Sequence, residues 1–314
     1  MEFKLCKFKG GKRGAYTLTF DDGCYYDSTR DVEAIFDKIL ERDNVKLKAT
    51  VGITLDFMHE KLINMWRELI DKGYFDIASH SVTHCICYAE ATEIEKREAD
   101  AKDSLNGIKK LFPNEEIIAF IIPNGGSTRE GRKILEKYYS ATRCGEERLN
   151  DIDNLDWFNL STYIAMINKT DKDYIGYIDE ALEKGGWGIQ TNHWITHKDE
   201  DKFHSQRYDT FVCECDYLSK AVKEKGLWLC SFNEGIKYFK KLNESRLIIT
   251  ENEQGYLLEL NLPKDFVFKD TYLTVETNTD KDIIVIEDGR KKVYKSKDGK
   301  AYLEIKDKIT VLNN

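Results

Sequence analysis

The sequence lacks the features that mark membrane-embedded, nucleic-acid-binding and repetitive proteins. It contains no apolar run long enough to cross a bilayer, and no internal repeat or low-complexity tract. Positive charge is not in excess, since Asp and Glu outnumber Lys and Arg and the net charge is -8. Like-charge repulsion makes an acidic chain a poor partner for nucleic acid or for anionic lipid. We therefore expect neither nucleic acid nor a membrane as a partner.

A secretory signal is also missing from the printed sequence. Residues 1–14 contain lysines, but no apolar segment and no small-residue cleavage site follow them. We expect a cytoplasmic protein, with secretion as the alternative if a leader has been removed. The sequence does not indicate an oligomeric state.

Disulfides are not needed either, although the eight cysteines form an even set. A chain of 314 residues can bury a sizeable core without covalent staples, so we expect reduced thiols. Two C-x-C pairs offer a cysteine zinc site as a weak alternative, because they lack the C-x-x-C spacing of a zinc knuckle. These pairs are Cys85 with Cys87 and Cys213 with Cys215.

Most of the chain alternates short apolar strands with amphipathic helices. Strands are expected at 15–20, 48–53, 75–79, 117–122, 139–143, 187–192 and 227–230. Helices are expected at 28–42, 57–72, 90–112, 127–138, 173–184, 208–225 and 231–242. Ser28 is a good N-cap for the first helix. This alternation predicts a parallel sheet, open or barrel-shaped, covered by helices.

The pattern changes after Asn243, where helical periodicity ends. Seven short strands are expected at 247–250, 256–260, 272–276, 283–287, 292–295, 301–305 and 308–312. Turn dipeptides such as Asp288-Gly289 and Asp298-Gly299 separate several of them. We therefore predict two domains, residues 1–243 and 244–314, the second a small all-β unit of sandwich type. Its role is not indicated by the sequence.

Two adjacent carboxylates, Asp21 and Asp22, end the first strand, and Gly23 permits a turn there. Carboxylates so close together repel unless a cation lies between them or one is protonated. An acidic turn without function is the alternative, because Asp-Gly is a common turn dipeptide. The pair His80 and His84, spaced H-x-x-x-H, favours the cation site.

Other polar residues also follow predicted strands. In parallel α/β folds, the carboxyl ends of the strands meet at one rim, where functional groups gather. The residues expected at that rim are Asp21, Asp22, His80, His84, Asn124, Arg143 and His193.

One carboxylate and two imidazoles form an open set of ligands for a divalent metal. We expect zinc (Zn2+) first, with cobalt (Co2+), nickel (Ni2+) or manganese (Mn2+) as alternatives. A bound metal lowers the pKa of its water and polarises a carbonyl. A second carboxylate can then take a proton, and a separate histidine can protonate a leaving group. This set predicts hydrolysis of an amide or ester.

Three segments resemble motifs of the polysaccharide deacetylases, carbohydrate esterase family four. They are Thr19-Phe20-Asp21-Asp22-Gly23, the segment from Ser79 to His84, and the strand-end His193. The resemblance covers roughly residues 14–241. It implies a distorted (β/α) barrel of about seven parallel strands, and removal of acetyl groups from an N- or O-acetylated oligo- or polysaccharide.

The same resemblance implies a role for each matched residue. Asp21 would be the general base and His193 the general acid. The metal and the backbone N–H of Asn124 would hold the oxyanion. The metal ligands would be Asp22, His80 and His84.

The third motif of that family departs most from the expected pattern. Residues 120–125, Phe-Ile-Ile-Pro-Asn-Gly, keep Pro and Gly but lack the usual Arg and Tyr. The missing Arg normally pairs with the catalytic carboxylate, and we hypothesise that Arg143 supplies that charge. The loss motivates one alternative, a catalytically degenerate carbohydrate-binding relative that keeps the metal. A hydrolase of another small amide or formyl group is the other alternative.

Several further residues have two interpretations. Residues 153–157, Asp-Asn-Leu-Asp-Trp, match the family's fourth motif but fit a surface loop equally well. His197 could exchange roles with His193. Trp194 is the best candidate for stacking on a sugar ring. His59 and His204 are expected at the surface.

Overall fold

The computed structural model describes residues 1–86, 88–90, 93–198 and 204–312. By contacts, the chain divides into two compact units. The α/β unit comprises Gly14–Gly235, and the β unit combines Met1–Arg13 with Ile236–Asn314. The division falls inside helix α7 (Phe232–Glu244), and the expected domain limit after Asn243 stays a prediction.

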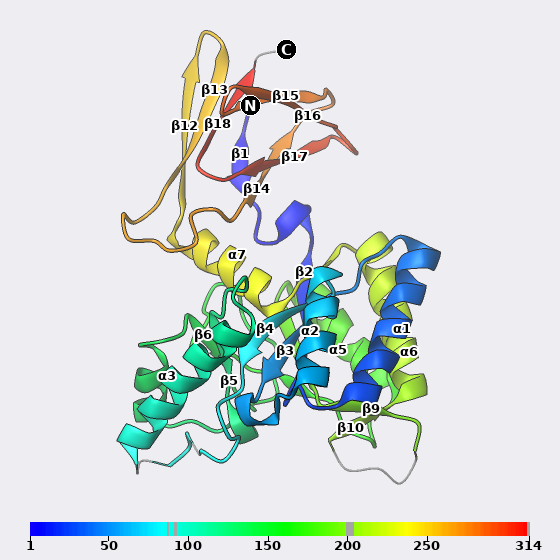
Figure 1. Ribbon diagram of the computed structural model, residues 1–314. Helices are drawn as coiled ribbons and strands as arrows, with labels where there is room; N and C mark the ends of the chain where they lie inside the picture. The colour runs from blue at the N-terminus through cyan, green and yellow to red at the C-terminus, as the bar shows by residue number, and fades with distance from the viewer. Residues whose placement is uncertain (87, 91–92, 199–203, 313–314) are drawn as a thin grey trace. The chain divides into compact units, whose positions relative to one another are not determined.

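An eight-stranded parallel sheet forms the centre of the α/β unit (Figure 1). Its order is β6-β5-β4-β3-β2-β8-β7, and β11 also pairs with β2. The strands are β2 (Gly14–Phe20), β3 (Ala49–Ile53), β4 (Phe75–Ser79), β5 (Ala119–Ile121), β6 (Ala141–Arg143), β7 (Tyr163–Ile164), β8 (Trp187–Asn192) and β11 (Leu227–Leu229). A parallel bridge between Arg143 and Leu160 links the β6 edge to the segment that leads into β7. The predicted distorted (β/α) barrel is confirmed.

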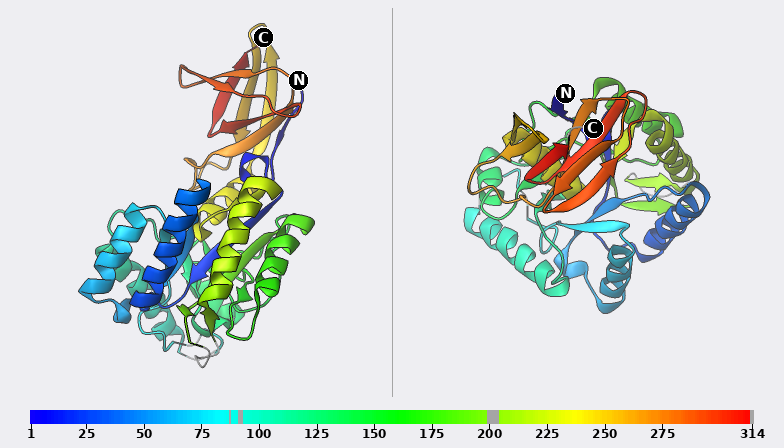
Figure 2. Two further views of the ribbon diagram at one scale, coloured as in Figure 1. Left: turned by 90° about the vertical axis from the view of Figure 1, so that its right-hand side faces the viewer. Right: turned by 90° about the horizontal axis from the view of Figure 1, so that it is seen from above.

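Helices surround this curled sheet (Figure 2). They are α1 (Tyr26–Asp43), α2 (Glu60–Asp71), α3 (Ile94–Leu111), α4 (Arg129–Leu135), α5 (Asp171–Lys184) and α6 (Tyr208–Lys220). Short helical turns lie at η2 (Leu55–Phe57), η3 (Pro123–Gly125) and η4 (Ala221–Lys225), and β9 (Trp194–Thr196) pairs in parallel with β10 (Ser205–Arg207). Within the described ranges, no helix is both long and apolar enough to traverse a bilayer.

The central strands β2, β3 and β8 have no exposed face, because helices or opposite barrel residues cover both of their faces. All seven residues of β2 are buried. Large side chains such as Trp66 and Trp187 are almost fully buried between sheet and helices. Each large apolar side chain removed from water contributes about 1.5–3 kcal/mol. The core therefore holds the strand ends, and the side chains that follow them, in fixed positions.

The start of α1 differs from its prediction. The helix begins at Tyr26, and Tyr25 occupies the N-cap position without a side-chain capping bond. Ser28 lies inside the first turn, where its hydroxyl accepts the N–H of Ile195 at 2.6 Å. The prediction that Ser28 caps the helix is wrong, because a long-range partner in β9 uses its side chain.

The β unit consists of two antiparallel sheets, ordered β1-β14-β17 and β12-β13-β18-β15-β16. The seven predicted strands are present as β12 (Arg246–Asn252), β13 (Gly255–Asn261), β14 (Leu273–Asn278), β15 (Ile283–Glu287), β16 (Arg290–Tyr294), β17 (Lys300–Ile305) and β18 (Lys308–Leu312). An eighth strand, β1 (Phe3–Leu5), was not predicted. It precedes the short turn η1 (Lys9–Gly11) and pairs with β14, at the far end of the sequence.

Candidate metal and catalytic site

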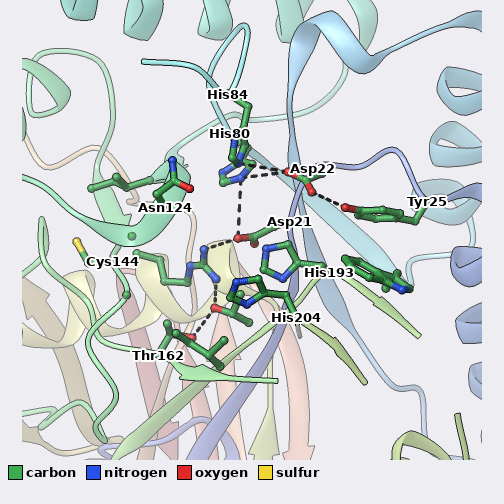
Figure 3. A pocket seen from close by; sticks show the side chains of 17 residues that line it. Asp21, Asp22, Tyr25, His80, His84, Asn124, Cys144, Thr162, His193 and His204 are labelled. Atoms are coloured by element: carbon green, nitrogen blue, oxygen red, sulfur yellow. Dashed lines mark hydrogen bonds and ion pairs between the residues drawn. The ribbon is translucent and has the colours of Figure 1, made fainter. Parts of the chain in front are cut away.

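A cavity of about 460 Å³ opens at the carboxyl ends of the parallel strands (Figure 3). All seven predicted site residues line it: Asp21, Asp22, His80, His84, Asn124, Arg143 and His193. Each lies at or just beyond the end of a strand, as the rim argument requires. Residues from five different strand ends therefore share one cavity.

The turn after β2 brings both carboxylates toward this cavity. Asp22 and Gly23 adopt left-handed backbone conformations, each with φ of 71°. Asp tolerates this region better than most residues, and Gly23 enters it without steric cost. The indole N–H of Trp66 donates to the Gly23 carbonyl at 2.8 Å and fixes the turn. The two acidic side chains therefore converge instead of pointing to opposite faces of a strand.

Asp22, His80 and His84 form a group that could hold a metal ion, with ligand atoms within 4.8 Å of one another. Oδ1 of Asp22 lies 3.5 Å from Nε2 of His80 and 3.5 Å from Nε2 of His84. These separations leave room for a cation between the three atoms.

The tautomer of His80 supports the same conclusion. Its Nδ1 lies 2.8 Å from the carbonyl oxygen of Ile121, which can only accept, so Nδ1 carries the proton. Nε2 of His80 then presents a lone pair to the group. Neither this Nε2 nor Oδ1 of Asp22 has a hydrogen-bond partner among the described residues, although both are buried. A buried unpartnered polar atom costs about 1–3 kcal/mol, and a divalent cation would remove that cost for both.

The loop that carries the two histidines is held from helix α3. The buried carboxylate of Asp100 accepts the N–H of Val82 at 2.9 Å and the hydroxyl of Tyr88 at 2.9 Å. Within the loop, the backbone N–H of His84 donates to the Ser81 hydroxyl at 2.8 Å. The H-x-x-x-H segment is therefore a braced loop and not a helical turn, which brings its two rings together.

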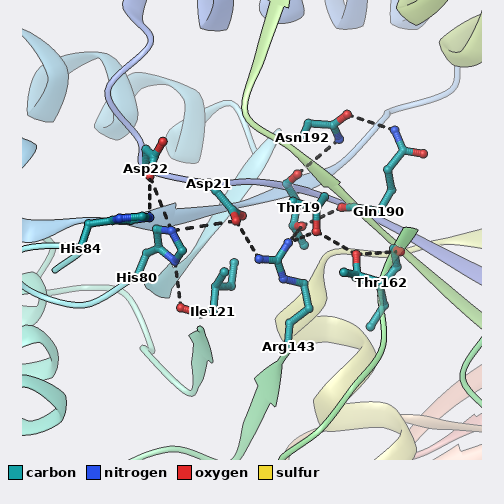
Figure 4. A network of polar contacts seen from close by, with 12 residues as sticks. Thr19, Asp21, Asp22, His80, His84, Ile121, Arg143, Thr162, Gln190 and Asn192 are labelled. Carbon is teal, nitrogen blue, oxygen red and sulfur yellow. Dashed lines mark hydrogen bonds and ion pairs between the residues drawn. The ribbon is translucent and has the colours of Figure 1, made fainter. Parts of the chain in front are cut away.

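Asp21 is paired with Arg143, as the sequence hypothesis requires (Figure 4). A guanidinium nitrogen of Arg143 lies 2.7 Å from Oδ2 of Asp21, and both side chains are almost fully buried. Arg143 also donates to the hydroxyls of Thr19 and Thr191. Burial by itself would raise the pKa of Asp21, but the charge of Arg143, with His80 and His193, holds it below its usual value. Asp21 is therefore ionised at neutral pH.

The remaining titratable groups at the site also have shifted pKa values. Burial opposes ionisation of Asp22, yet the nearby His80 and the Tyr25 hydroxyl lower its pKa to about 2. Burial, followed by the proximity of His80, lowers the pKa of His84. Burial likewise lowers the pKa of His193. At neutral pH the metal-ligand group therefore offers an ionised carboxylate and, at His84, a neutral imidazole.

His193 follows β8 and lies beside Asp21 in the cavity (Figure 3). Its buried Nδ1 has no hydrogen-bond partner among the residues described. The ring packs near Trp194 and near His204, with centroids 6.4 and 5.2 Å away. His197 does not line the cavity, and its Nε2 lies 3.1 Å from a carboxylate oxygen of Asp31. This placement favours His193 over His197 for proton transfer at the cavity.

Two residues that line the cavity were not predicted to do so from the sequence. Tyr25 lies near the metal-ligand group, and its hydroxyl donates to Oδ2 of Asp22 at 2.9 Å. His204 is exposed, as expected, yet it lines the cavity. Proximity of Tyr25 to the Asp-Asp-Gly turn was the only available signal for the first. No signal pointed to His204, because its position depends on the fold of distant segments.

The other motifs noted in the sequence, residues 153–157 and the two C-x-C pairs, are not part of the metal-ligand group. The segment from Asp153 to Trp157 does not line the cavity, and Asp156 pairs with Arg132 at 3.2 Å. Cys213 is exposed whereas Cys215 is buried, and both are free thiols. Of the other C-x-C pair, Cys85 is a free thiol and Cys87 lies outside the described residues. Among the described residues, the only group that could hold a metal is that of Asp22, His80 and His84.

The fold and site define a (β/α) barrel with an Asp-His-His group at its rim. Residues 9–140 match the sequence model of the polysaccharide deacetylase family. The resemblance drawn from the motifs is therefore confirmed, and this part of the chain carries the pattern of that family. No curated protein sequence matches the chain.

Similar solved structures include a candidate polysaccharide deacetylase from Mycobacterium smegmatis, at 10% identity and a TM-score of 0.54, covering 79% of this chain and 98% of that one. A family 4 acetyl xylan esterase from Clostridium thermocellum, solved with a cobalt ion, has 18% identity and a TM-score of 0.47 over 70% and 89% of the two chains. A CE4 family pseudoenzyme from Bacillus anthracis has 12% identity and a TM-score of 0.48 over 72% and 66%. At such identities a likeness bears on the fold alone.

Proposed function

We propose that this protein is a metal-dependent deacetylase that removes acetyl groups from an N- or O-acetylated saccharide. The observation that carries the proposal is the pair of buried, unpartnered ligand atoms, Oδ1 of Asp22 and Nε2 of His80, beside a second carboxylate held by an arginine. A structural polar core would be expected to satisfy these atoms internally. The match to the polysaccharide deacetylase family supports the substrate class.

Asp22, His80 and His84 would hold the metal, and zinc suits two imidazoles and one carboxylate with open positions. A divalent ion there supplies a Lewis acid that acidifies a water molecule and polarises the acyl carbonyl. Cobalt, nickel and manganese remain alternatives for the same ligand set.

Asp21 is proposed as the general base. Its Oδ2 is held by Arg143, whereas its Oδ1 is buried and has no hydrogen-bond partner among the described residues. The lowered pKa keeps Asp21 ionised, so Oδ1 is ready to accept a proton in the cavity. The contact with Arg143 supports catalysis over the degenerate, carbohydrate-binding alternative, because the charge missing from the third motif is restored from β6.

His193 is proposed as the general acid that protonates the leaving sugar nitrogen or oxygen. It lines the same cavity as Asp21 and Asn124. The backbone N–H of Asn124 is proposed to stabilise the developing oxyanion. Trp194, which also lines the cavity, is proposed as the surface for a sugar ring.

The test is release of acetate from acetylated chito- and xylo-oligosaccharides by protein that has been stripped of metal and reloaded with zinc. Acetate release that requires the reloaded metal supports the proposal. Zinc bound at one equivalent with no acetate released would favour the degenerate binding protein, and the oligosaccharide affinity would then be measured directly. Release of formate or of another small acyl group, without acetate, would favour the alternative hydrolase.

A further inference from the structure

The second oxygen of the Asp22 carboxylate is held by Tyr25. The Tyr25 hydroxyl donates to Oδ2 at 2.9 Å, while Oδ1 faces Nε2 of His80 and Nε2 of His84 at 3.5 Å each. A carboxylate fixed at one oxygen presents the other in a single direction. Figure 3 shows the phenol ring on the side of Asp22 away from His80 and His84, with its hydroxyl pointing at the carboxylate.

The backbone of Tyr25 is anchored independently of the site. Tyr25 is the N-cap residue of α1, and its carbonyl accepts both the N–H and the hydroxyl of Thr29, at 2.9 and 2.8 Å. The hydroxyl of Tyr25 is therefore a hydrogen-bond donor whose backbone is fixed at the start of a long helix. Asp22, by contrast, lies in a left-handed turn with φ of 71°. The hydroxyl that holds Asp22 is therefore positioned by a different element from the turn that carries Asp22.

The ring of Tyr25 has a second contact at the cavity. Its centroid lies 5.0 Å from that of Trp194, with the planes tilted by 35°. Both residues line the cavity, and Trp194 directly follows His193. Aromatic pairs at this separation contribute about 0.5–1.5 kcal/mol beyond the burial of their area. Tyr25 therefore links the metal-ligand group to the proposed sugar surface.

We infer that Tyr25 is a positioning residue that aims Asp22 at the metal through its hydroxyl and supports Trp194 through its ring. The inference rests on the proposed metal site and adds a residue to it. Hydrogen-bond partners that orient metal ligands are commonly worth 10–100-fold in metal affinity. The two contacts use different parts of one side chain, so they can be separated by substitution.

The experiment titrates zinc into the stripped full-length protein by calorimetry, for the wild type and three variants. Tyr25→Phe removes the hydroxyl but keeps the ring, and Tyr25→Leu removes both. Tyr26→Phe is the matched control, because the neighbouring ring contacts Lys61 and not the site. We expect zinc affinity to fall about 10–100-fold in both Tyr25 variants and to stay unchanged in the control.

Two further measurements separate positioning from a merely structural effect. The visible absorption spectrum of the cobalt-loaded protein should change in Tyr25→Phe, because a loosened Asp22 alters the ligand geometry. At saturating zinc, KM for an acetylated oligosaccharide should stay unchanged in Tyr25→Phe and rise about two- to tenfold in Tyr25→Leu, which removes the support of Trp194. Thermal unfolding of the metal-free variants shows whether each variant is folded. If Tyr25→Leu is not folded, the zinc affinity of Tyr25→Phe alone tests whether the hydroxyl positions Asp22.

The outcomes distinguish this inference from the proposed function. A wild type that binds no zinc overturns the proposed metal site and this inference with it. A wild type that binds zinc, with Tyr25→Phe equal to it within twofold and an unchanged cobalt spectrum, overturns the role of Tyr25 and leaves the proposed function standing. An unchanged KM in a folded Tyr25→Leu overturns the support of Trp194.

Discussion

The two units of this protein each bury a polar group, and they treat it in opposite ways. In the β unit, the fully buried Lys241 donates to the carbonyl oxygens of Lys269, Thr271 and Lys306, at 2.7, 2.7 and 2.5 Å. In the α/β unit, Asp22 and His80 are also buried, but each leaves one atom without a hydrogen-bond partner. The two sites are therefore alike in burial and differ in whether their buried polar atoms have hydrogen-bond partners.

Lack of a partner does not mark a site by itself, since the buried hydroxyl of Thr277 in the β unit and Oε1 of Glu214 in the α/β unit also lack one among the described residues. Buried polar groups in folded proteins nearly always have partners, because an unpartnered one costs free energy. The three contacts of Lys241 meet this requirement and hold segments of the β unit together. The atoms of Asp22 and His80 do not meet it, and their lone pairs converge on one small volume. Such a group is expected to reach its lowest free energy with a cation bound.

Substitution of Asp22 tests the comparison most strongly. Asp22→Ala removes the only carboxylate of the ligand group, and we expect zinc binding to fall below detection by calorimetry. The metal-free protein should lose some stability, because the folded state favours the ionised Asp22, whose pKa is lowered to about 2, and the substitution leaves the Tyr25 hydroxyl without its acceptor. Asp27→Ala, on the exposed side of α1, is the control for charge alone. Zinc bound with wild-type affinity by Asp22→Ala would place the metal elsewhere.

Asp21→Asn should separate the two adjacent carboxylates. The amide keeps the size of the side chain but cannot accept a proton as a base, so acetate release should fall about 1,000-fold. Zinc affinity should stay near that of the wild type, since the Asp22 group is intact. Parallel loss of zinc in this variant would show that Asp21 is a ligand and would remove the division of roles.

Lys241→Met tests the structural side of the comparison. The substitution leaves three carbonyl oxygens without their shared donor, and we expect the free energy of unfolding to fall by about 2–4 kcal/mol. Zinc affinity should not change. Urea unfolding monitored by circular dichroism gives the first quantity, with the exposed Lys291→Met as control. A stability equal to that of the wild type would mean that these carbonyls find other partners.

Arg143→Met tests whether the guanidinium keeps the pKa of Asp21 low. Without the guanidinium, burial dominates and the pKa of Asp21 should rise. Because the base must be ionised, the acid limb of the kcat/KM profile should move to higher pH, and turnover at pH 7 should fall about 30-fold. Turnover and a pH profile identical to those of the wild type would remove Arg143 from the site.

The smallest effect concerns the pH dependence of zinc binding. The pKa of Asp22 is about 2, and burial lowers that of His84 below its ordinary 6.5. Protons bound to either group would compete with the metal, but neither binds protons appreciably above pH 7. Zinc affinity should therefore change less than about threefold between pH 8 and 7 and fall steeply below pH 6. A steep change above pH 7 would point to a different ligand.

Local patterns in the chain determined much of this protein. Most strands of both units follow from the sequence pattern and turn residues, whereas β1, β7, β9 and β10 were not predicted, and the rim residues follow from their position after the predicted strands. The two carboxylates and the two histidines were found because the members of each pair lie within a few residues of each other, whereas the choice of Asp22, His80 and His84 as metal ligands came from the resemblance to the family. The seven strands after Asn243 were correct because their pattern is also local.

Only the tertiary structure decided which distant residues meet. β1 pairs with β14 from the opposite end of the chain, and Ser28 contacts β9 instead of capping its own helix. The contact of Arg143 with Asp21 was a hypothesis until β6 and β2 were placed in one barrel, and the contact of Tyr25 with Asp22 depended on where α1 begins. Short-range propensity acts over one helical turn or one strand, whereas these contacts are selected by the packing of the whole unit.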